Sequence, residues 1–521
     1  MEKLKSLRKT LVEHWKSDIV DVVCSKQSRV VFITAFLAAF CCYFEFLKNS
    51  HGTADWLNEG YLIYTNANWA LSLGRWFLRF VNLATFNVVN PAFCIVVCTF
   101  LQAFSVILIL RLWDIKSTVF TVLSTVAIVV SSAVTVQYLY VYTAVPYGVA
   151  LLTATLSAYL ILQHKEKYYI VISAILLALG LGCYQSYVGF AAGIIICTLI
   201  LRLIKDNDAI QTLKTGGAAL IMGVIGGSLY LLFWKFFKAY YSVSAASYGG
   251  ASRIGLRNVL INLLSSVRNA YKDFFRYYFN TNCHRNIFFC IVLLMIVILI
   301  IALKNKITIK CGVVALLLFV PLAFNFVDII ATERNINVLM GHQMQLVIPF
   351  LFALIECSGF KQTIRKGLNY VSVLAVTAIC IVFMVRAFAT YKTVDLSYRY
   401  VETVAEPIVQ HIISQSDYTS ESRIAFIGYP DESRIQKANP LQNMSYFRQS
   451  AVFWYSMDCR VIWKQFILTT FGVDSGWISK QEYDAILDSE QFQGMACYPE
   501  EGAIQKIDDI WVVKFMDNPT R

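Results

Sequence analysis

Long apolar segments alternate with short polar ones from about residue 30 to residue 390 of the 521-residue chain. About eleven of these segments approach the roughly 20 residues that a helix needs to cross the hydrocarbon core of a bilayer. They lie approximately at residues 30–47, 91–112, 117–137, 143–163, 168–182, 186–203, 215–234, 287–303, 308–326, 341–358 and 368–388. The pattern predicts an all-α, polytopic membrane protein with about eleven transmembrane helices.

The stretch His51–Phe80, between the first two apolar segments, is too polar to span a bilayer but has the spacing of a surface helix. Asp55 and Glu59 are four residues apart, so one helical face would carry both carboxylates. The apolar residues that recur with helical spacing are Leu62, Trp69, Leu73, Trp76 and Phe80. We therefore expect an interfacial helix in the first external loop, beside an acidic pair that looks like a site.

Residues 168–203 form either one overlong helix or two helices separated at the sequence GLGCYQSY, Gly180–Tyr187. The distribution of lysine and arginine favours the break. With the break, and with a cytoplasmic amino terminus, the basic residues fall in the predicted inside segments, and the short outside turns hold only Arg334. The N-terminus is thus predicted to lie inside and the C-terminal region outside.

The composition becomes polar after about residue 390, over a length typical of a soluble domain. Within this region Arg423–Tyr429 and Asp509–Phe515 have the pattern of strands, and Val401–Gln415 has that of a helix. A small α/β or α+β domain is expected. The predicted division is a cytoplasmic segment at 1–29, a transmembrane catalytic region at 30–389 and an extracytoplasmic domain at 390–521.

Composition agrees with this class, because 57% of residues are hydrophobic and 15% are charged, whereas soluble domains carry about 25% charged residues. The predicted spans are nearly free of ionisable side chains, which ion-coupled transporters usually need inside the membrane. The chemistry is therefore expected outside the spans. The 14 cysteines lie mostly in apolar segments without a CxxC pair, which indicates packing residues.

The external loop at residues 235–286 contains eight lysines and arginines but a single acid, Asp273. Arginine suits phosphate oxygens, which it can bind through two hydrogen bonds. Two interpretations are open: the loop lies on anionic lipid, or it forms a phosphate site built partly from Arg253 and Arg257. An amphipathic helix is also expected in this loop, from about Leu256 to Phe279.

Four motifs, all predicted on one side of the membrane, resemble the glucosyltransferase II family of serotype-converting enzymes, within the GT-C superfamily. They are the acid Asp55, the triplet Gly74-Arg75-Trp76, the segment Leu181–Tyr187 and the segment Glu333–Asn335. The resemblance covers roughly residues 30–390. It implies transfer of a sugar, glucose by the family's name, from a polyprenyl-phosphate carrier to a cell-surface glycan such as O-antigen, outside the bacterial cytoplasmic membrane.

Inverting transfer needs a carboxylate that accepts the proton of the acceptor hydroxyl, and the leaving phosphate needs positive charge. We assign the base to Asp55, with Glu59 as the second candidate. The residues expected to bind the donor phosphate are Arg75, Arg253, Arg257 and Arg334. Those expected to bind the donor or acceptor sugar are Tyr184, Gln185 and Glu333.

Each assignment has a structural alternative. Asp55 could be the N-cap of the interfacial helix, Glu59 could lie on a solvated helix face, and Arg75 could extend to lipid head groups. Tyr184 and Gln185 could be ordinary interfacial residues. Two further alternatives are that Glu333 and Arg334 pair with each other and that His342 is a packed helix residue.

No spacing typical of metal ligands is present, and we expect no cofactor; a divalent ion would have to be held by Asp55 and Glu59 with phosphate oxygens. The expected partners are the lipid-linked donor, the glycan acceptor and the bilayer, with no nucleic acid. Two other functional classes fit a polytopic protein with basic external loops: a lipid-linked sugar flippase or polysaccharide polymerase, and a non-catalytic receptor or scaffold. A flippase should have charged or strongly polar residues lining a central cavity, which these spans lack.

Overall fold

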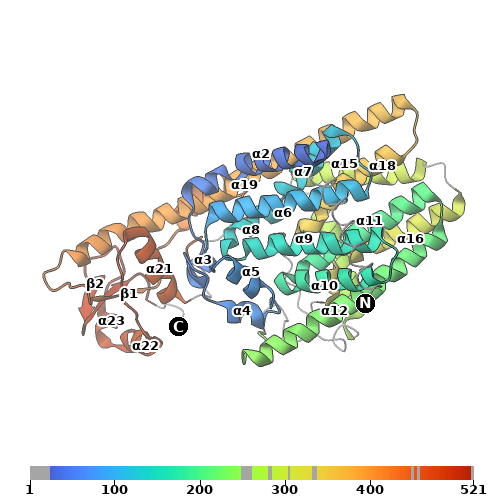
Figure 1. The fold of residues 1–521 in the computed structure, drawn as a ribbon. Coiled ribbons are helices and arrows are strands. Elements are labelled where there is room, and N and C mark those ends of the chain that lie inside the picture. Colours follow the sequence, from blue (N-terminus) through green and yellow to red (C-terminus); the bar gives the residue numbers. More distant parts are fainter. Residues whose placement is uncertain are drawn as a thin grey trace.

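The computed structural model describes residues 24–247, 261–279, 284–302, 306–330, 337–447, 451–453 and 458–517. Long helices lie side by side in a bundle, and a small domain with a sheet lies beyond one end of that bundle (Figure 1). Helix α19 (Gln362–Ile413) extends along the bundle and into the small domain. Four predicted site residues lie outside the described residues: Arg253, Arg257, Glu333 and Arg334.

Side-chain caps fix where several bundle helices begin. Ser25, Asn90 and Ser117 each accept a hydrogen bond from the backbone N–H three residues later, which satisfies a donor that the first helical turn leaves free. The bundle helices are α2 (Lys26–Asn49), α6 (Pro91–Leu112), α7 (Thr118–Val129), α8 (Ser132–Gln137), α9 (Val141–Gln163), α10 (Tyr168–Cys183), α11 (Val188–Asp206), α12 (Ala209–Tyr240), α14 (Leu263–Phe279), α15 (His284–Ala302), α16 (Ile307–Phe324), α17 (Phe326–Ile330) and α18 (Val347–Cys357). Short 3-10 helices also occur: η1 (Tyr138–Tyr140), η2 (Gln185–Tyr187) and η4 (Val338–Leu346).

Eight helical stretches in the described part of the chain are long and apolar enough to cross a membrane. The expectation of a helical, multi-pass membrane protein is thereby confirmed. About eleven spans were predicted; the difference arises because α10 and the segment Asn286–Ile301 are shorter, and because Thr118–Gln163 is one stretch that contains two predicted spans.

The break predicted at Gly180–Tyr187 is present. Helix α10 ends at Cys183, Tyr184 has an extended backbone (φ −159°), and α11 follows η2. Near the end of α11, Arg202 donates from Nη2 to the carbonyl oxygen of Leu162, near the end of α9, at 2.6 Å. Because α10 starts just after α9, this contact means that the chain reverses direction between α10 and α11.

The prediction of one interfacial helix in the first external loop is wrong. The loop contains three short helices, α3 (Ala54–Glu59), α4 (Ala67–Ser72) and α5 (Leu78–Ala84). Gly60 (φ +102°) and Gly74 (φ +88°) adopt left-handed backbone conformations that interrupt a helix. The predicted apolar stripe is accordingly divided, with Leu62 65% exposed and Trp76 4% exposed.

The predicted amphipathic helix of the basic loop is present over its described part, α14. Its buried residues recur every fourth position, at Ser266, Ala270, Phe274 and Tyr278, which is the spacing of one helical face. Nearby Lys272 and Arg276 are exposed on the other side.

The C-terminal domain contains both predicted strands, β1 (Arg423–Ile427) and β3 (Ile510–Lys514), together with β2 (Ile504–Ile507), which was not predicted. The strand order is β1-β3-β2, with β1 parallel and β2 antiparallel to β3. Four helices accompany the sheet: α20 (Ser433–Ala438), α21 (Cys459–Phe471), α22 (Lys480–Asp488) and α23 (Glu490–Gly494). This region is therefore a small mixed α/β unit.

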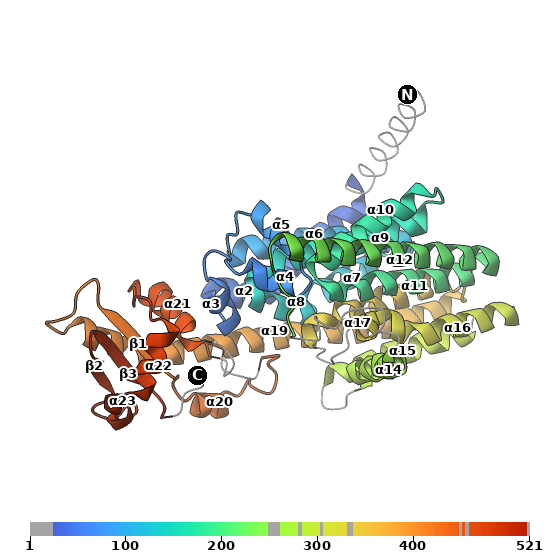
Figure 2. The same ribbon diagram turned by 90° about the horizontal axis from the view of Figure 1, so that it is seen from below.

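Helix α19 continues without interruption through residues 389 and 390, where the two domains were predicted to meet. Just after this point, Tyr391 Oη donates to the carbonyl oxygen of Thr135 in α8 at 2.8 Å. The predicted helix Val401–Gln415 is the last part of α19. Figure 2 shows the same helix passing from the bundle to the domain in a single rod.

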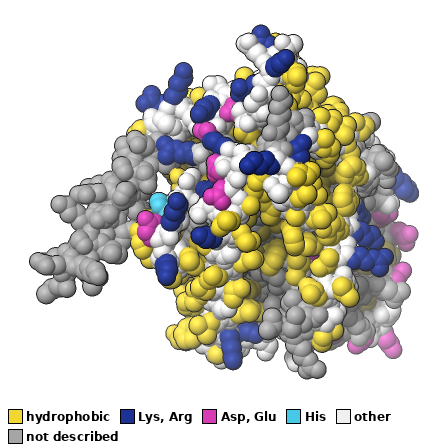
Figure 3. Space-filling view, turned by 90° about the vertical axis from the view of Figure 1, so that its right-hand side faces the viewer, with side chains coloured by type: hydrophobic (Ala, Val, Ile, Leu, Met, Phe, Trp, Pro, Cys, Tyr) yellow, Lys and Arg dark blue, Asp and Glu magenta, His cyan; other side chains and the backbone are white. Residues whose placement is uncertain are grey.

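The end of the bundle remote from the C-terminal domain carries the ends of α6, α9, α11 and α18 together with the starts of α7 and α19. Figure 3 views this end, where Lys and Arg side chains are gathered with a few acids. Lys116 and Lys205, in segments predicted to lie inside, are both strongly exposed here. Basic segments predicted on one side of the membrane therefore share one end of the bundle.

Candidate active site

Helix α3 presents the acidic pair and begins with a side-chain cap. Thr53 is the N-cap: its Oγ1 accepts a hydrogen bond from the backbone N–H of Trp56 at 3.4 Å and donates to the carbonyl oxygen of Leu139 at 3.0 Å. Asp55 lies in the first turn, so the alternative that it is the N-cap is wrong. Glu59 is the last helical residue, one turn further on, as the four-residue spacing predicted.

One face of α3 packs against the C-terminal domain. Ala54 and Leu57 are fully buried in a cluster with Val401 of α19 and Phe466 of α21. The backbone N–H of Ala54 also donates to the carbonyl oxygen of Ala451 at 2.7 Å. The position of the acidic pair therefore depends on residues that lie about 350 to 400 positions later in the sequence.

Glu59 is buried, with 4% of its surface exposed. Asn66 donates from Nδ2 to Oε1 of Glu59 at 3.3 Å, while Oε2 has no hydrogen-bond partner among the described residues. Burial, and secondly the negative charge of Asp55, raises the pKa of Glu59 to about 7. The alternative that Glu59 lies on a solvated helix face is wrong.

Asp55 is partly buried, and its carboxylate makes no hydrogen bond or ion pair within the described part of the chain. Burial raises the pKa of Asp55 to about 7, against the opposing effect of the positive charge on Arg75. The positive charge of Arg75 also lowers the pKa of Glu59, against the effect of burial. The two acids and Arg75 therefore form one electrostatic unit.

Arg75 lies against two tyrosine rings. Its Cζ is 5.0 Å from the ring centroid of Tyr184 and 5.9 Å from that of Tyr147, and these two rings stack at 4.2 Å. These contacts are cation–π interactions. Nε of Arg75 is buried and has no hydrogen-bond partner among the residues described. Arg75 is thus held inside the protein rather than extended toward lipid head groups.

The segments Gly74-Arg75-Trp76 and Leu181–Tyr187 are in direct contact. Gln185 donates from Nε2 to the carbonyl oxygen of Leu73 at 2.7 Å and to Tyr230 Oη at 3.0 Å. The backbone N–H of Phe77 donates to the carbonyl oxygen of Gly182 at 2.7 Å. Tyr184 is buried at 2% exposure, so it is not a lipid-facing anchor. Gln185 positions the loop that carries Arg75.

The structure therefore brings together Asp55, Glu59, Arg75, Tyr184 and Gln185, whereas Arg253, Arg257, Glu333 and Arg334 lie outside the described residues. His342 is buried between Tyr187 Oη (3.3 Å from Nδ1) and the carbonyl oxygen of Ile128 (3.2 Å from Nε2). It is a packed residue, as expected, although its helix η4 is of the 3-10 type.

The family model described as glucosyl transferase GtrII matches residues 58–348, more than half of the chain. The chain belongs to this family. No match is found among curated proteins or among solved structures. The chain is therefore a glucosyltransferase, and its apolar helices make it a membrane protein. The matched range includes Glu59, Arg75, Tyr184 and Gln185 and begins three residues after Asp55.

Sequence reasoning missed Tyr147, which belongs to the site of this GtrII-family enzyme, and Asp328, a buried acid elsewhere in the bundle. Tyr147 forms half of the ring pair under Arg75 and follows Pro146, a proline inside α9; a proline within an apolar segment was the available signal. Asp328 is a buried acid in α17, a helix that packs against α14 and touches η2. It lies just past the predicted span 308–326 and was therefore overlooked.

The described residues of this GtrII-family enzyme include no group of three or more His, Cys, Asp and Glu side chains that could hold a metal ion. The positive charge beside the acidic pair is supplied by Arg75.

Proposed function

We propose that this membrane glucosyltransferase transfers glucose from a polyprenyl-phosphate-linked donor to a cell-surface glycan, with inversion at the anomeric carbon and with Asp55 as general base. The supporting observation is the partly buried Asp55 carboxylate, with its pKa raised to about 7, within electrostatic range of Arg75. A base is most effective when its pKa lies near the working pH, which this environment provides.

In the proposed reaction, Asp55 accepts the proton of an acceptor hydroxyl as the hydroxyl oxygen attacks the anomeric carbon of the donor. The bond between this carbon and the phosphate oxygen breaks at the same time, so the configuration inverts. Polyprenyl phosphate leaves with the bonding electrons. Glu59, buried four residues away, raises the negative charge density at the site and is the second candidate for the base.

The leaving phosphate gains negative charge, and Arg75 is suited to stabilise it. Its Nε lacks a hydrogen-bond partner among described residues, and the rings of Tyr147 and Tyr184 hold the guanidinium in place. A preorganised donor of this kind stabilises developing charge without reorganisation. Arg253, Arg257 and Arg334 are proposed to add further positive charge, with Glu333 contacting the sugar. We propose that no metal ion is needed.

We propose that the acidic pair lies outside the bacterial cytoplasmic membrane. Lys116 and Lys205, exposed lysines of the predicted inside loops, share the opposite end of the bundle, as the positive-inside rule requires for the cytoplasmic side. The C-terminal domain would then lie outside, where an acceptor glycan can reach α3.

The proposal is tested with the full-length protein in detergent and polyprenyl-phosphate glucose labelled in the sugar. The assay measures release of polyprenyl phosphate and appearance of label in a lipopolysaccharide acceptor. We expect Asp55→Asn to reduce release by roughly a hundredfold or more while the lipid donor still binds. Unchanged release by this variant and by Glu59→Gln would overturn the assignment of the base to this helix.

A further inference from the structure

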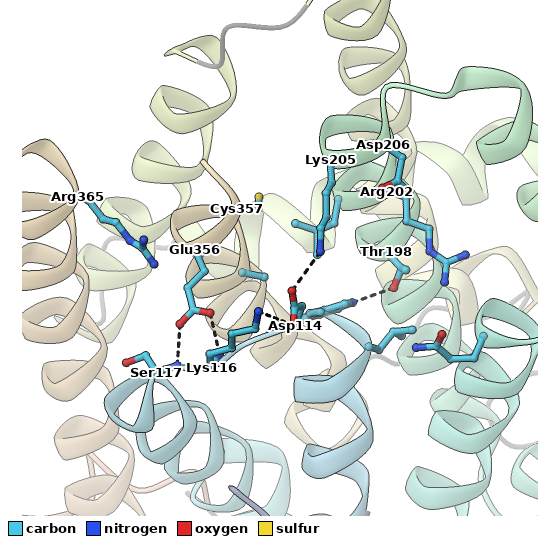
Figure 4. Close-up of a pocket in the computed structure, with 15 residues that line it drawn as sticks. Asp114, Lys116, Ser117, Thr198, Arg202, Lys205, Asp206, Glu356, Cys357 and Arg365 are labelled. Carbon is cyan, nitrogen blue, oxygen red and sulfur yellow. Dashed lines mark hydrogen bonds and ion pairs between the residues drawn. The ribbon is translucent and has the colours of Figure 1, made fainter. Parts of the chain in front are cut away.

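A second site is suggested by a cavity of about 710 Å³ at the end of the bundle remote from α3 (Figure 4). Helix α2 connects this end of the bundle with the end that carries Asp55. At the start of α2, Gln27 Nε2 donates a hydrogen bond to the carbonyl oxygen of Ile115 at 2.6 Å, beside the cavity. The other end of α2 leads into α3 and Asp55. The length of α2, about 36 Å for 24 residues, separates the two sites.

Three acids lie in the cavity wall, and two of them, Glu356 and Asp114, are already occupied. Glu356 accepts hydrogen bonds from the backbone N–H groups of Lys116 and Ser117, at 2.7 and 2.8 Å, and so caps the start of α7. Asp114 pairs with Lys116 at 3.4 Å and with Lys205 at 3.1 Å. One carboxylate is therefore shared between two lysines, which leaves positive charge available.

The two arginines of the wall retain free donors. Arg202, beside Asp206, donates a hydrogen bond from Nη2 to the carbonyl oxygen of Leu162. A guanidinium carries five N–H groups, so others remain available to a ligand. The side chain of Arg365 makes no hydrogen bond or ion pair with any described residue, and in Figure 4 its guanidinium points from α19 toward the cavity. The wall thus has four basic side chains, namely Lys116, Arg202, Lys205 and Arg365.

The inner lining is apolar. Trp113, Leu201 and Ala353 are buried there. The indole N–H of Trp113 donates a hydrogen bond to Thr198 Oγ1 at 2.8 Å, so it is not available to a ligand. A ligand would therefore place an apolar portion inward and its charge at the basic rim. A cavity of this volume lies within the usual range of small-ligand sites, roughly 300–1,000 Å³.

We propose that this cavity binds a phosphate-bearing ligand, with Arg365 and Arg202 as the hydrogen-bond donors and Lys116 and Lys205 as supporting charges. Guanidinium groups bind phosphate oxygens through paired hydrogen bonds. The cavity should therefore bind a phosphate group more tightly than an uncharged ligand. The phosphate has two sources, the head group of an anionic phospholipid from the adjacent leaflet or a water-soluble phosphate compound. The inference does not depend on the mechanism proposed at Asp55.

The test uses the full-length protein in detergent with three probes: inorganic phosphate, dihexanoyl phosphatidylglycerol below its micelle concentration, and dihexanoyl phosphatidylcholine as a zwitterionic comparison. Binding is measured by microscale thermophoresis. The test variant is Arg365→Gln, which removes an exposed side chain without partners and should leave folding intact. The matched control is Lys366→Gln, an exposed neighbour that does not line the cavity.

We expect saturable binding of at least one anionic probe, weakened about tenfold or more by Arg365→Gln and unchanged by Lys366→Gln, because a hydrogen bond between charged groups is lost. Binding of phosphatidylglycerol without phosphate assigns the site to lipid; binding of phosphate at comparable strength assigns it to a soluble ligand. The proposal is overturned if neither anionic probe binds, if phosphatidylcholine binds equally well, or if both variants weaken binding to the same extent.

Discussion

Gln185 donates a hydrogen bond from Nε2 to the carbonyl oxygen of Leu73 at 2.7 Å, although 112 residues separate the two in the chain. The bond ties the turn between α10 and α11 to the external loop immediately before Arg75. A second contact, from the N–H of Phe77 to the carbonyl oxygen of Gly182, fastens the same two segments on the other side of Arg75. The guanidinium is therefore fixed relative to the ring of Tyr184 that it covers.

Replacing Asp55 with Asn should reduce kcat by roughly a hundredfold or more, the usual contribution of a general base, while the dissociation constant of the lipid donor changes little. The measurement is polyprenyl phosphate release together with donor binding. Glu406→Gln, an exposed acid on α19, is the control and should be fully active. A larger loss for Glu59→Gln than for Asp55→Asn would transfer the role of base to Glu59.

The pH dependence of activity should show the raised pKa values of both acids, about 7. The base acts when ionised, so kcat/KM should rise as pH increases through about 7 and level off above it. The slope should disappear in the residual activity of Asp55→Asn. A flat profile between pH 5 and pH 8 in the unmodified enzyme would contradict this.

Stability should depend on pH in the opposite sense. The folded-state pKa of Asp55 is raised from 3.8 to about 7, so the folded protein holds a proton that the unfolded chain releases near pH 4. The free energy of unfolding should therefore fall as pH rises from about 4 to 7 and then stay level. Asp55→Asn should raise Tm at pH 8 more than at pH 5, as measured by thermal unfolding in detergent. Glu406→Gln should produce no such difference.

Arg75→Gln should lower kcat/KM for the lipid donor by roughly a hundredfold, since one donor to developing charge typically contributes this much. Arg75→Lys should retain part of the activity, because it keeps the charge but loses the planar guanidinium. Arg79→Gln is the matched control: Arg79 lies four residues on and stacks on Tyr241 at 3.8 Å. Equal losses at Arg75 and Arg79 would argue against a specific phosphate contact.

Gly74→Ala should destabilise the protein by about 1–3 kcal/mol and reduce activity. The backbone of Gly74 has φ +88°, and an added Cβ would lie 2.3 Å from Tyr230 Oη and 2.5 Å from Gln185 Nε2. Thermal unfolding and donor turnover measure the effect. Gly223→Ala in α12, where no atom lies within 4 Å of the added Cβ, should be neutral or slightly stabilising.

Apolar periodicity predicted most of the bundle because hydrophobic length and helix formation are coupled in a membrane. Each predicted segment corresponds to a helical region in the described chain, including the break before Tyr184. The spacing of Asp55 and Glu59 also predicted correctly that both acids lie on the same helix, which is the six-residue α3. These features depend on local sequence.

The remaining features depend on contacts between distant segments. The periodicity of Leu62, Trp69 and Trp76 predicted a single surface helix, but Gly74, with positive φ, interrupts it and Trp76 packs against Phe237 of α12. Strand β2 has only four residues and acquires its conformation by pairing with β3. Tyr147 joins the site only because α9 passes beside η2, which local patterns do not encode.

Helix α19 has mechanical consequences for the enzyme. Its 52 residues form one rod that ends in the C-terminal domain, and that domain packs on α3. A tilt of the rod would move the acidic pair together with the domain instead of opening a gap between them.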